Sequence, residues 1–421
     1  MKKLIYIAVL IVSGKALLAQ CISTPFERKY IYQKSTLSFN ADYFCNSNAI
    51  TTEFTNTFFQ NGYISTIMKD RVAEKLRLEN RLGAEFNCSI FYKYKPDTLS
   101  KNSKFGFFVS IKNRAHVDMR FSKDLFMLGF YGNKLFEDQT AYCSNFNLTA
   151  FQYQQFQLGI TKKINNGEVT YGLGLSALNG QQYQNLFAKK AELYTAKDGQ
   201  FIDFNSNITY KQSDTSKSKF GSNNGFGFGV DVFADIPYLT REDRSEKITI
   251  EVRDIGMIWW KEQSRTAVAD SFYHYDGVAV NNIFQLNNAA FGNGNKDSLT
   301  NKIVKSTPGK FTSTLPAMLH FNSLSTFGKW QLSKGLRYIY NANNKYNVYV
   351  TANYFIKPKL MVSLGASYGG YSLLNITTGF AVDFGKGLML HVYSNNIEGF
   401  IVPSIAVGQG LAFSVIKSFA K

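Results

Sequence analysis

The sequence predicts an all-β protein, a transmembrane antiparallel β-barrel of about 14 strands within a range of roughly 12–16. Three observations indicate this fold class. Apolar and polar residues alternate with a period of two over long segments, which predicts strands with two unlike faces. Aromatic residues make up 15% of the chain and glycine is plentiful (32), whereas proline is scarce (7). The chain ends in QGLAFSVIKSFAK, an amphipathic aromatic segment of the kind that ends bacterial barrels.

Residues 1–20 are expected to be a signal peptide. Lys2 and Lys3 make a basic start, LIYIAVLIVSG is an apolar stretch of secretory length, and ALLAQ offers a cleavage site. An uncleaved anchor is the alternative, but Lys15 interrupts the apolar run well short of the ~20 residues that a spanning helix needs. The segment LAQC, which ends at Cys21, also resembles a lipidation site. We therefore expect export to the bacterial outer membrane.

Charge and cysteine content suggest partners and cross-links without fixing them. The formal net charge of +17 favours an anionic partner. For an exported protein this partner is outer-membrane lipid and lipopolysaccharide, not nucleic acid, although diffuse solvation charge explains the excess equally well. In an oxidising compartment four cysteines can form two disulfides in three possible pairings. The candidates are Cys21, Cys45, Cys88 and Cys143.

The most extended alternation covers residues 75–95, KLRLENRLGAEFNCSIFYKYK. Its even positions, from Leu76 to Tyr94, are apolar except for Asn80, whereas its odd positions carry most of the charge. About 21 residues at ~3.3 Å each reach near 70 Å, well beyond a ~30 Å hydrocarbon core. In a barrel the apolar face contacts lipid and the charged face lines a wet lumen. With one residue from KITIEVRD, the lumen-lining candidates are Lys75, Arg77, Glu79, Arg81, Glu85 and Arg253. A charge network that only stiffens the barrel is the alternative.

The other strands follow in order along a single domain, residues 22–421. Their segments are STLSFNADYFC, QQFQLGITKKI, EVTYGLGLSA, FIDFNSNITYK, GFGFGVDVFADI, KITIEVRD, YNVYVTANYF, LMVSLGASYGG, ITTGFAVDF and GLMLHVYS. Turns are expected at Asn165-Asn166-Gly167, Asp198-Gly199, Lys357-Pro358-Lys359 and Gly385-Lys386-Gly387.

Two segments depart from this strand pattern. Residues 261–310 form one long polar excursion, and short turns on one side with longer loops on the other are typical of outer-membrane barrels. Residues 122–136 (SKDLFMLGFYGNKLF) are the only stretch in which a short helix is expected, as a plug inside the barrel. The alternative is a long strand with its loop.

No residue pattern indicates an enzyme, a metal site or a cofactor. The histidines (His116, His274, His320 and His391) do not stand at metal-ligand spacing. The glycines of YGLGLSALNG and GFGFGVD lie in strand alternation, where they make room in the lumen and do not cradle a dinucleotide. The segment HYDG at 274–277, with Asp270 and Ser271, lacks a third catalytic partner.

Several blocks together resemble an uncharacterised bacteroidete family of expected outer-membrane barrels. The most specific is SIKNRAHVDMRFSKDLFMLGFYGNKLF, and others are FQYQQFQLGITKK, LSALNGQQY, LYTAKDG, VRDIGMIWW, YDGV and STLPAML. More distantly the chain is similar to the PorP/SprF membrane proteins of type IX secretion and to FadL-like fatty-acid transporters, both 14-stranded barrels. The resemblance implies fold and location and carries over no functional residue.

Three functions are compatible with these observations. The leading hypothesis is a non-enzymatic outer-membrane barrel that serves as scaffold or accessory of a surface or secretion assembly, with a partner protein from that assembly. The alternative is a FadL-like channel or transporter for a small or hydrophobic solute. The third is a secreted β-rich binding protein.

Overall fold

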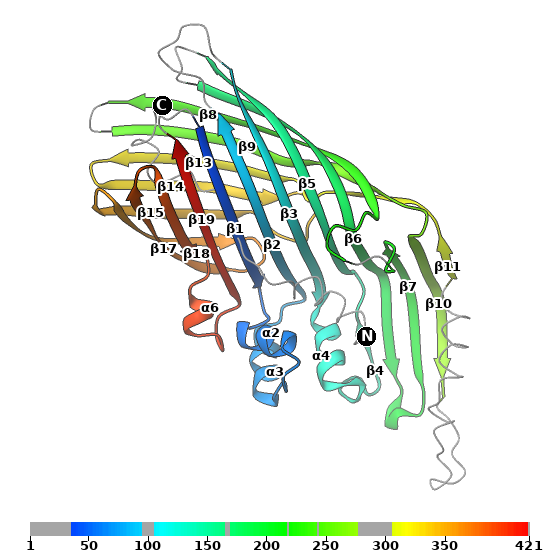
Figure 1. Cartoon of the computed structure of the whole chain (residues 1–421). Coiled ribbons are helices and arrows are strands. Elements are labelled where there is room, and N and C mark those ends of the chain that lie inside the picture. Colours follow the sequence, from blue (N-terminus) through cyan, green and yellow to red (C-terminus); the bar gives the residue numbers. More distant parts are fainter. Residues whose placement is uncertain are drawn as a thin grey trace.

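The computed structural model describes residues 35–94, 105–164, 169–216, 219–241, 244–276 and 305–419. The predicted signal peptide, Cys21 and the expected turn at 165–167 lie outside these ranges. The described strands belong to one sheet (Figure 1). None of the helices in the described ranges is long and apolar enough to cross a membrane.

Fourteen strands close into an antiparallel barrel, which confirms the predicted fold class and strand number. The barrel closes because β1 pairs with β2 on one side and with the last strand, β19, on the other. The barrel strands are β1 (Ser35–Ser47), β2 (Glu79–Tyr94), β3 (Phe105–Ser122), β5 (Phe146–Ile164), β6 (Val169–Thr195), β8 (Gly225–Thr240), β9 (Arg244–Trp260), β13 (Met318–Phe327), β14 (Trp330–Ile339), β15 (Asn347–Lys357), β16 (Leu360–Gly369), β17 (Leu374–Gly385), β18 (Leu388–Ser394) and β19 (Gly408–Phe419).

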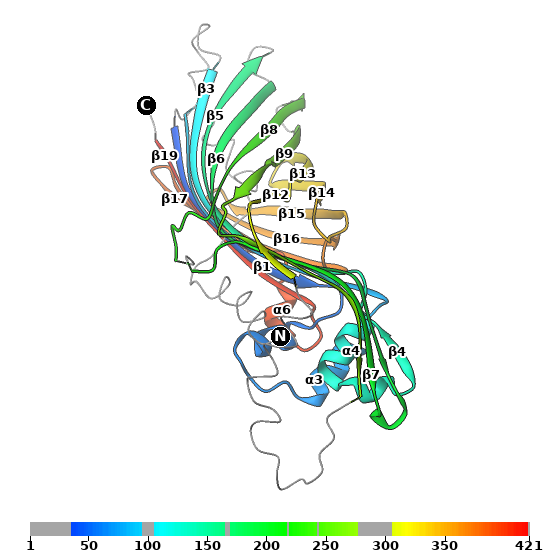
Figure 2. The same cartoon turned by 90° about the vertical axis from the view of Figure 1, so that its right-hand side faces the viewer.

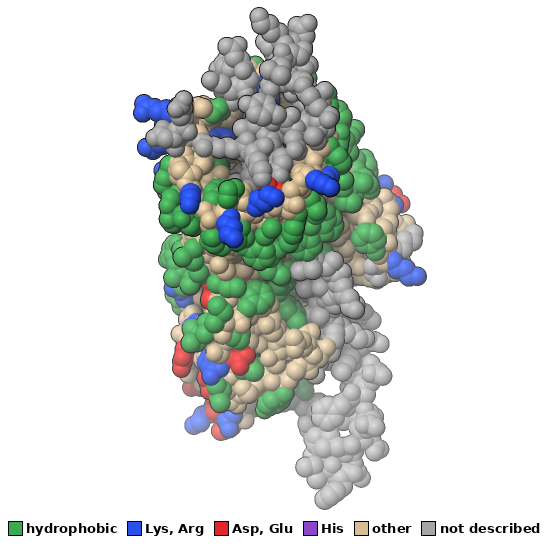
Figure 3. Space-filling view, turned by 60° about the vertical axis from the view of Figure 1, so that its left-hand side comes forward, with side chains coloured by type: hydrophobic (Ala, Val, Ile, Leu, Met, Phe, Trp, Pro, Cys, Tyr) green, Lys and Arg blue, Asp and Glu red, His purple; other side chains and the backbone are tan. Residues whose placement is uncertain are grey.

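Each barrel strand turns its apolar positions outward and its polar positions inward. On β5, Phe156 and Leu158 are 50% and 66% exposed, whereas Gln155 and Gln157, which alternate with them, are buried inside the barrel. The same alternation recurs on β1, β3, β6 and β16. Figure 3 shows apolar side chains gathered on one face of the barrel. An outward apolar surface on a closed barrel is typical of proteins that contact lipid.

The two ends of the barrel differ. At one end, which we call the turn end, strands are joined by short connections such as Gly385-Lys386-Gly387, where all three residues have positive φ. At the other, the loop end, longer segments carry helices and further strands (Figure 1). The C-terminal Phe419 of β19 lies at the turn end, since it pairs with Ser35. Short turns at one end and longer loops at the other are the predicted arrangement.

A smaller sheet projects from the loop end, and we call it the side sheet. β6 is 27 residues long, and its neighbour changes from β8, which it pairs with up to Gly180, to β7, which it pairs with from Gln184. The side sheet consists of the far half of β6 with β4 (Gln139–Tyr142), β7 (Ile202–Gln212), β10 (Arg265–Tyr275) and β11 (Lys305–Pro308). A further short strand, β12 (Phe311–Thr314), pairs with β9. The excursion predicted at 261–310 therefore contains strands, and only its middle lies outside the described residues.

Helices gather at the loop end, and most of them were not predicted. They are α2 (Thr52–Phe59), α3 (Thr66–Ala73), α4 (Lys123–Tyr131) and α6 (Glu398–Ile401), with the 3-10 turns η2 (Asn133–Phe136) and η3 (Lys197–Gly199). α4 and η2 bear out a helix in residues 122–136, but the plug position is wrong. Phe126 of α4 packs in one cluster with Leu82 and Phe121. Leu82 of β2 and Phe121 of β3 point outward, because each lies an odd number of positions from the lumen residue of its strand, Glu85 or His116.

The predicted disulfides among the described cysteines do not form. Cys45, Cys88 and Cys143 are all free. In the β1–β2 hairpin Cys45 lies opposite Ala84 and Cys88 lies opposite Ala41. The Cα atoms of Cys45 and Cys88 are thus offset by four residues along the hairpin, or roughly 13 Å. A disulfide needs Cα atoms within about 7 Å.

Candidate functional site in the barrel lumen

A β-bulge in β9 places two successive charged residues in the lumen. Val230 of β8 pairs with Ile255 and Val232 pairs with Val252, so Asp231 lies opposite both Arg253 and Asp254. Asp254 has a φ of 60°, and its backbone N–H donates to Asp231 Oδ1 at 2.7 Å. A bulge breaks the alternation of faces, and both side chains line the same cavity.

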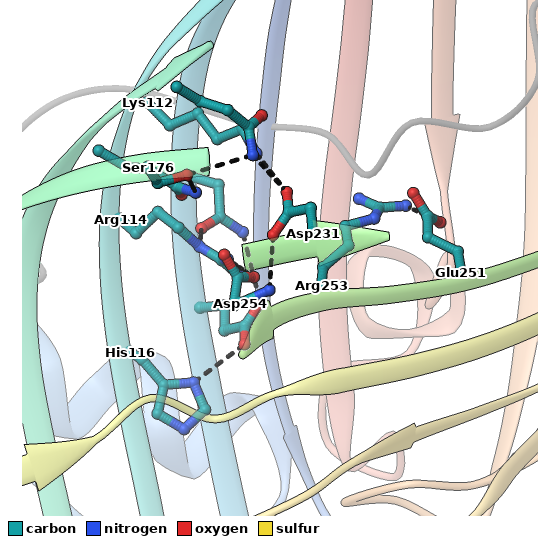
Figure 4. A network of polar contacts seen from close by, with 12 residues as sticks. Lys112, Arg114, His116, Ser176, Asp231, Glu251, Arg253 and Asp254 are labelled. Atoms are coloured by element: carbon teal, nitrogen blue, oxygen red, sulfur yellow. Dashed lines mark hydrogen bonds and ion pairs between the residues drawn. The ribbon is translucent and has the colours of Figure 1, made fainter. Parts of the chain in front are cut away.

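The charged side chains in mid-lumen form a network of ion pairs (Figure 4). Arg114 pairs with Asp254, and Lys112 Nζ lies 3.6 Å from Asp231. Arg253 pairs with its neighbour Glu251. Buried charges are tolerated only when they are paired and hydrogen-bonded.

Neutral side chains and a histidine extend this network. Gln157 Nε2 donates to Asp231 Oδ2 at 2.6 Å and to Ser176 Oγ at 3.2 Å. Nearer the loop end, His116 Nδ1 lies 2.9 Å from Glu85 Oε1, and both side chains are buried. The network thus joins β2, β3, β5, β6, β8 and β9 across the lumen.

The structure places only some of the predicted lumen residues in the lumen. Arg81 and Glu85 of β2 and Arg253 of β9 face inward and are mostly buried. Glu79 is exposed at the first position of β2.

Lys75 and Arg77 lie before the strand, which corrects their predicted position. The amide of Lys75 donates to Val72 O in a final turn of α3. The side chain of Asn80 then accepts a hydrogen bond from Arg77 N at 2.9 Å and donates to Arg77 O at 2.7 Å. These contacts form a turn, so β2 starts at Glu79 and has 16 residues.

The sequence analysis missed most of the network. Lys112, Arg114, His116 and Asp118 stand at alternate positions of SIKNRAHVDMR, which is the same signal that singled out residues 75–95. The signal for Asp254 was weaker, because its bulge breaks the alternation.

A cavity of about 380 Å³ lies among these charges and toward the turn end. Aromatic side chains line the part near the turn end, where the Phe108 ring centroid is 5.7 Å from that of Phe91 and 6.3 Å from that of Phe233. Two glycines make room for these rings, and one of them, Gly172, belongs to the predicted segment YGLGLSALNG. A Cβ at Gly159 or Gly172 would come within 2.0 Å of Phe108 or Phe233.

A second cavity of about 140 Å³ lies toward the loop end. It is lined mainly by amide and hydroxyl side chains from β13 to β18. The two cavities share the lining residues His320, Asn322, Ile339, His391 and Tyr393. They are therefore neighbouring chambers of one lumen, separated by these side chains.

Loops fold inward at the loop end and narrow the entrance to the smaller cavity. The Tyr371 ring lies against Gly83, and its hydroxyl donates to Asp118 Oδ1 at 2.8 Å. Asn343 N also donates to Asp118 Oδ1, at 2.9 Å, and Arg81 Nε donates to Gly370 O at 2.8 Å. Burial, together with the neighbouring Asp118, raises the pKa of Tyr371 well above its ordinary value, so the hydroxyl keeps its proton and this contact.

A closed barrel with an apolar outer surface and a polar lumen defines this protein as a β-barrel of the outer-membrane type. The chain belongs to the family of unknown function DUF5723, whose profile matches residues 33–392. This confirms the family that the sequence blocks indicated. A comparison with curated proteins found no match.

Solved structures share the fold at low sequence identity. A deltaS2S3 mutant of TodX, a monoaromatic hydrocarbon channel, has a TM-score of 0.50 and 10% identity over 96% of this chain and 97% of its own. The Ralstonia pickettii toluene transporter TbuX has a TM-score of 0.45 and 9% identity over 92% and 90%. A Pseudomonas aeruginosa FadL homologue has a TM-score of 0.43 and 8% identity over 92% and 90%. The similarity to PorP/SprF proteins stays a prediction.

Proposed function

We propose that this protein is an outer-membrane channel that carries a small solute through its lumen, which is the FadL-like alternative of the sequence analysis. One observation carries the proposal: two adjoining cavities, of about 140 and 380 Å³, run from the loop end into the barrel. The interior of a purely structural protein is packed to nearly constant density with few voids larger than a water molecule. Adjoining chambers in a polar lumen are what a solute path requires.

The charges of the larger cavity favour neither cations nor anions. Its lining includes five Lys or Arg and six Asp or Glu side chains, and most of them are held in the ion pairs described above. Pores that select ions by charge carry rings of one sign. A balanced network fits a path for small organic solutes better than a path for ions.

The membrane setting is part of the same proposal. The outward apolar side chains would contact lipid acyl chains, and the charged loop end would meet lipopolysaccharide. The similar fold of a monoaromatic hydrocarbon channel agrees with a transport role. The scaffold role in a secretion assembly remains a hypothesis that rests on the distant resemblance to PorP/SprF.

Solute flux into liposomes that contain the purified full-length protein tests the proposal. Ser89 lines the larger cavity, so Ser89→Trp should remove most of the flux by filling the path. Ile90 is its neighbour on the outward face and is 52% exposed, so Ile90→Trp is the matched control and should leave flux unchanged. Liposomes that exclude every small solute, or equal flux through both variants, would show that the proposed function is wrong.

A further inference from the structure

The smaller cavity contains one cationic side chain, Arg337 of β14, and no Asp or Glu among its described lining residues. Two cations of the larger cavity are paired with acids, in Lys112–Asp231 and Arg114–Asp254. Within the described ranges of the chain, the Arg337 side chain makes no hydrogen bond or close ion pair. It packs on the ring of Tyr349 and acts on the Asp42 carboxylate only through its charge. A half-buried guanidinium with no hydrogen-bonded anion can bind one from a ligand.

The sequence of β14 positions Arg337 in this cavity. In WQLSKGLRYI the positions of Ser333, Gly335 and Arg337 alternate onto the lumen face. Gly335 leaves room for the neighbouring strand, because a Cβ there would lie 2.6 Å from the Tyr349 hydroxyl. Tyr349 can therefore lie beside Arg337, whose Cζ is 5.3 Å from the ring centroid.

Hydrogen bonds fix the position of the Tyr349 ring on which Arg337 packs. The Tyr349 hydroxyl donates to Asn322 Oδ1 at 2.9 Å and lies 2.7 Å from His320 Nε2. A cation–π contact stabilises the charge of Arg337 but satisfies none of the five N–H donors of the guanidinium. Those donors stay available to a planar anion such as a carboxylate.

The rest of the lining supplies hydrogen-bonding groups for a hydroxylated molecule. It includes eight asparagines and five serines or threonines. Two buried acceptors, Asn46 Oδ1 and Asn396 Oδ1, have no donor within the part of the chain that the structure describes, and Asn396 is fully buried. Buried polar atoms without a partner are rare. The asparagine, serine and threonine side chains of the lining can pair with the hydroxyl groups of a bound molecule.

We infer that the smaller cavity is a binding site for a small hydrophilic carboxylate that carries hydroxyl groups, such as a sugar acid. The carboxylate binds Arg337, and the hydroxyl groups bind the asparagine side chains. We place this site at the entry of the solute path, so the inference rests on the proposed channel function. A volume of about 140 Å³ is close to the ~150 Å³ of a cavity that binds benzene, which suits a small solute or one end of a larger one.

Calorimetric titration of the purified full-length protein in detergent tests the site with three probes. Gluconate has both the carboxylate and the hydroxyl groups, glucose lacks the carboxylate, and hexanoate lacks the hydroxyl groups. Gluconate should bind more tightly than either. Arg337→Gln should weaken gluconate binding roughly tenfold or more, because a charge-assisted pair is lost, and should leave glucose binding unchanged.

A variant on the same strand is the matched control. Lys334→Gln removes the same charge from the opposite, outward face of β14 and should leave gluconate binding unchanged. Ser367→Asp keeps Arg337 but adds an acid to the same cavity, so it should also weaken gluconate binding. This second variant decides the matter if Arg337→Gln does not fold, as judged by its circular dichroism.

The outcomes separate the site from the channel. Equal affinity for gluconate and glucose, or gluconate binding that survives both lumen variants, would overturn the carboxylate site. Inorganic phosphate is a fourth probe, and tighter binding of phosphate than of gluconate would overturn the assignment to a carboxylate. A protein that binds gluconate but carries no solute into liposomes would overturn the channel proposal and leave the site intact.

Discussion

At the scale of single residues, Asp254 is constrained by its backbone conformation, its burial and its ion pair. It lies at the bulge with a φ of 60°, it is 1% exposed, and it pairs with Arg114 of a strand that is 140 residues away in sequence. Asp and Asn tolerate this backbone region better than most residues. The position therefore requires both a short polar side chain for the backbone and a negative charge for Arg114.

Asp254→Asn should lower the free energy of unfolding by about 3–5 kcal/mol, because it leaves the Arg114 charge buried without its partner. Asparagine keeps the size of the side chain and the tolerance of positive φ, so the loss reports the charge. Urea unfolding of the protein in detergent measures it. The double variant Arg114→Gln with Asp254→Asn should lose less than the two single variants summed. Additive losses would show that the pair does not contribute as an ion pair.

The helices at the loop end pack as one layer at the scale of elements. The Phe126 ring centroid of α4 is 5.6 Å from that of Phe54 in α2 and 4.6 Å from that of Phe130. α2 and α3 begin at side-chain caps, where Thr51 accepts from Phe54 N and Ser65 accepts from Met68 N, each at 3.3 Å. Packing against the outward face of β2 and β3 supplies the remaining stability, since helices of eight residues are marginal alone.

Phe126→Ala should destabilise this layer by about 3–5 kcal/mol, through loss of apolar burial and the cavity that remains. Phe126 is 4% exposed. Limited proteolysis between β1 and β2 should accelerate, while the barrel keeps its β-rich circular dichroism. Leu135→Ala is the control, because Leu135 is 52% exposed and should give little change. Proteolysis at the wild-type rate in Phe126→Ala would contradict the packing role of this ring.

A tyrosine links two of these helices and makes their contact sensitive to alkali. The Tyr131 hydroxyl of α4 donates to Asp70 Oδ1 of α3 at 2.5 Å. Burial and the Asp70 carboxylate raise the pKa of Tyr131 to about 12. Since the folded pKa lies above the unfolded value of about 10, the contribution to stability is complete below pH 10 and is lost as the pH rises through about 12. Ultraviolet titration of phenolate should show one fewer late-titrating tyrosine in Tyr131→Phe than in the wild type.

The sequence predicts the faces of the strands better than it predicts strand starts or short helices. Alternation predicted the two faces of β2, β5 and the first half of β6, because side-chain direction in a strand depends only on local backbone geometry. It misplaced the start of β2, although Asn80, the one polar residue on the apolar stripe, is the residue that forms the preceding turn. The helices α2 and α3 were missed because their periodic patterns span only eight residues, even though Thr51 and Ser65 are recognisable caps.

The candidate site shows where sequence information ends. The alternating charges of SIKNRAHVDMR predict which side chains face the lumen, but not that Arg114 meets Asp254. Such pairings depend on the order of strands around the barrel and on the bulge, which are properties of the closed sheet. The cavity around Arg337 likewise gathers residues from β13 to β18, and no single segment shows it.

At the scale of the whole molecule, the long strand β6 connects the barrel with the side sheet. Its 27 residues at ~3.3 Å each span roughly 90 Å, about three times a ~30 Å hydrocarbon core. The half that pairs with β8 belongs to the barrel, and the half that pairs with β7 extends beyond it (Figure 2). The side sheet and the helices therefore lie at the same end of the barrel as the smaller cavity.

This asymmetry predicts which end faces the outside of the cell. Outer-membrane barrels have short turns on the periplasmic side and longer loops outside, so the loop end should be extracellular. An epitope inserted at Asp198, exposed at the tip of the β6–β7 hairpin, should bind antibody on intact cells. The same epitope at Lys386, in the turn between β17 and β18, should bind only after the outer membrane is permeabilised. The reverse pattern would invert the orientation, so that solute would enter the smaller cavity from the periplasm. Both epitopes lie in connections outside the barrel wall, so neither insertion should prevent the barrel from closing.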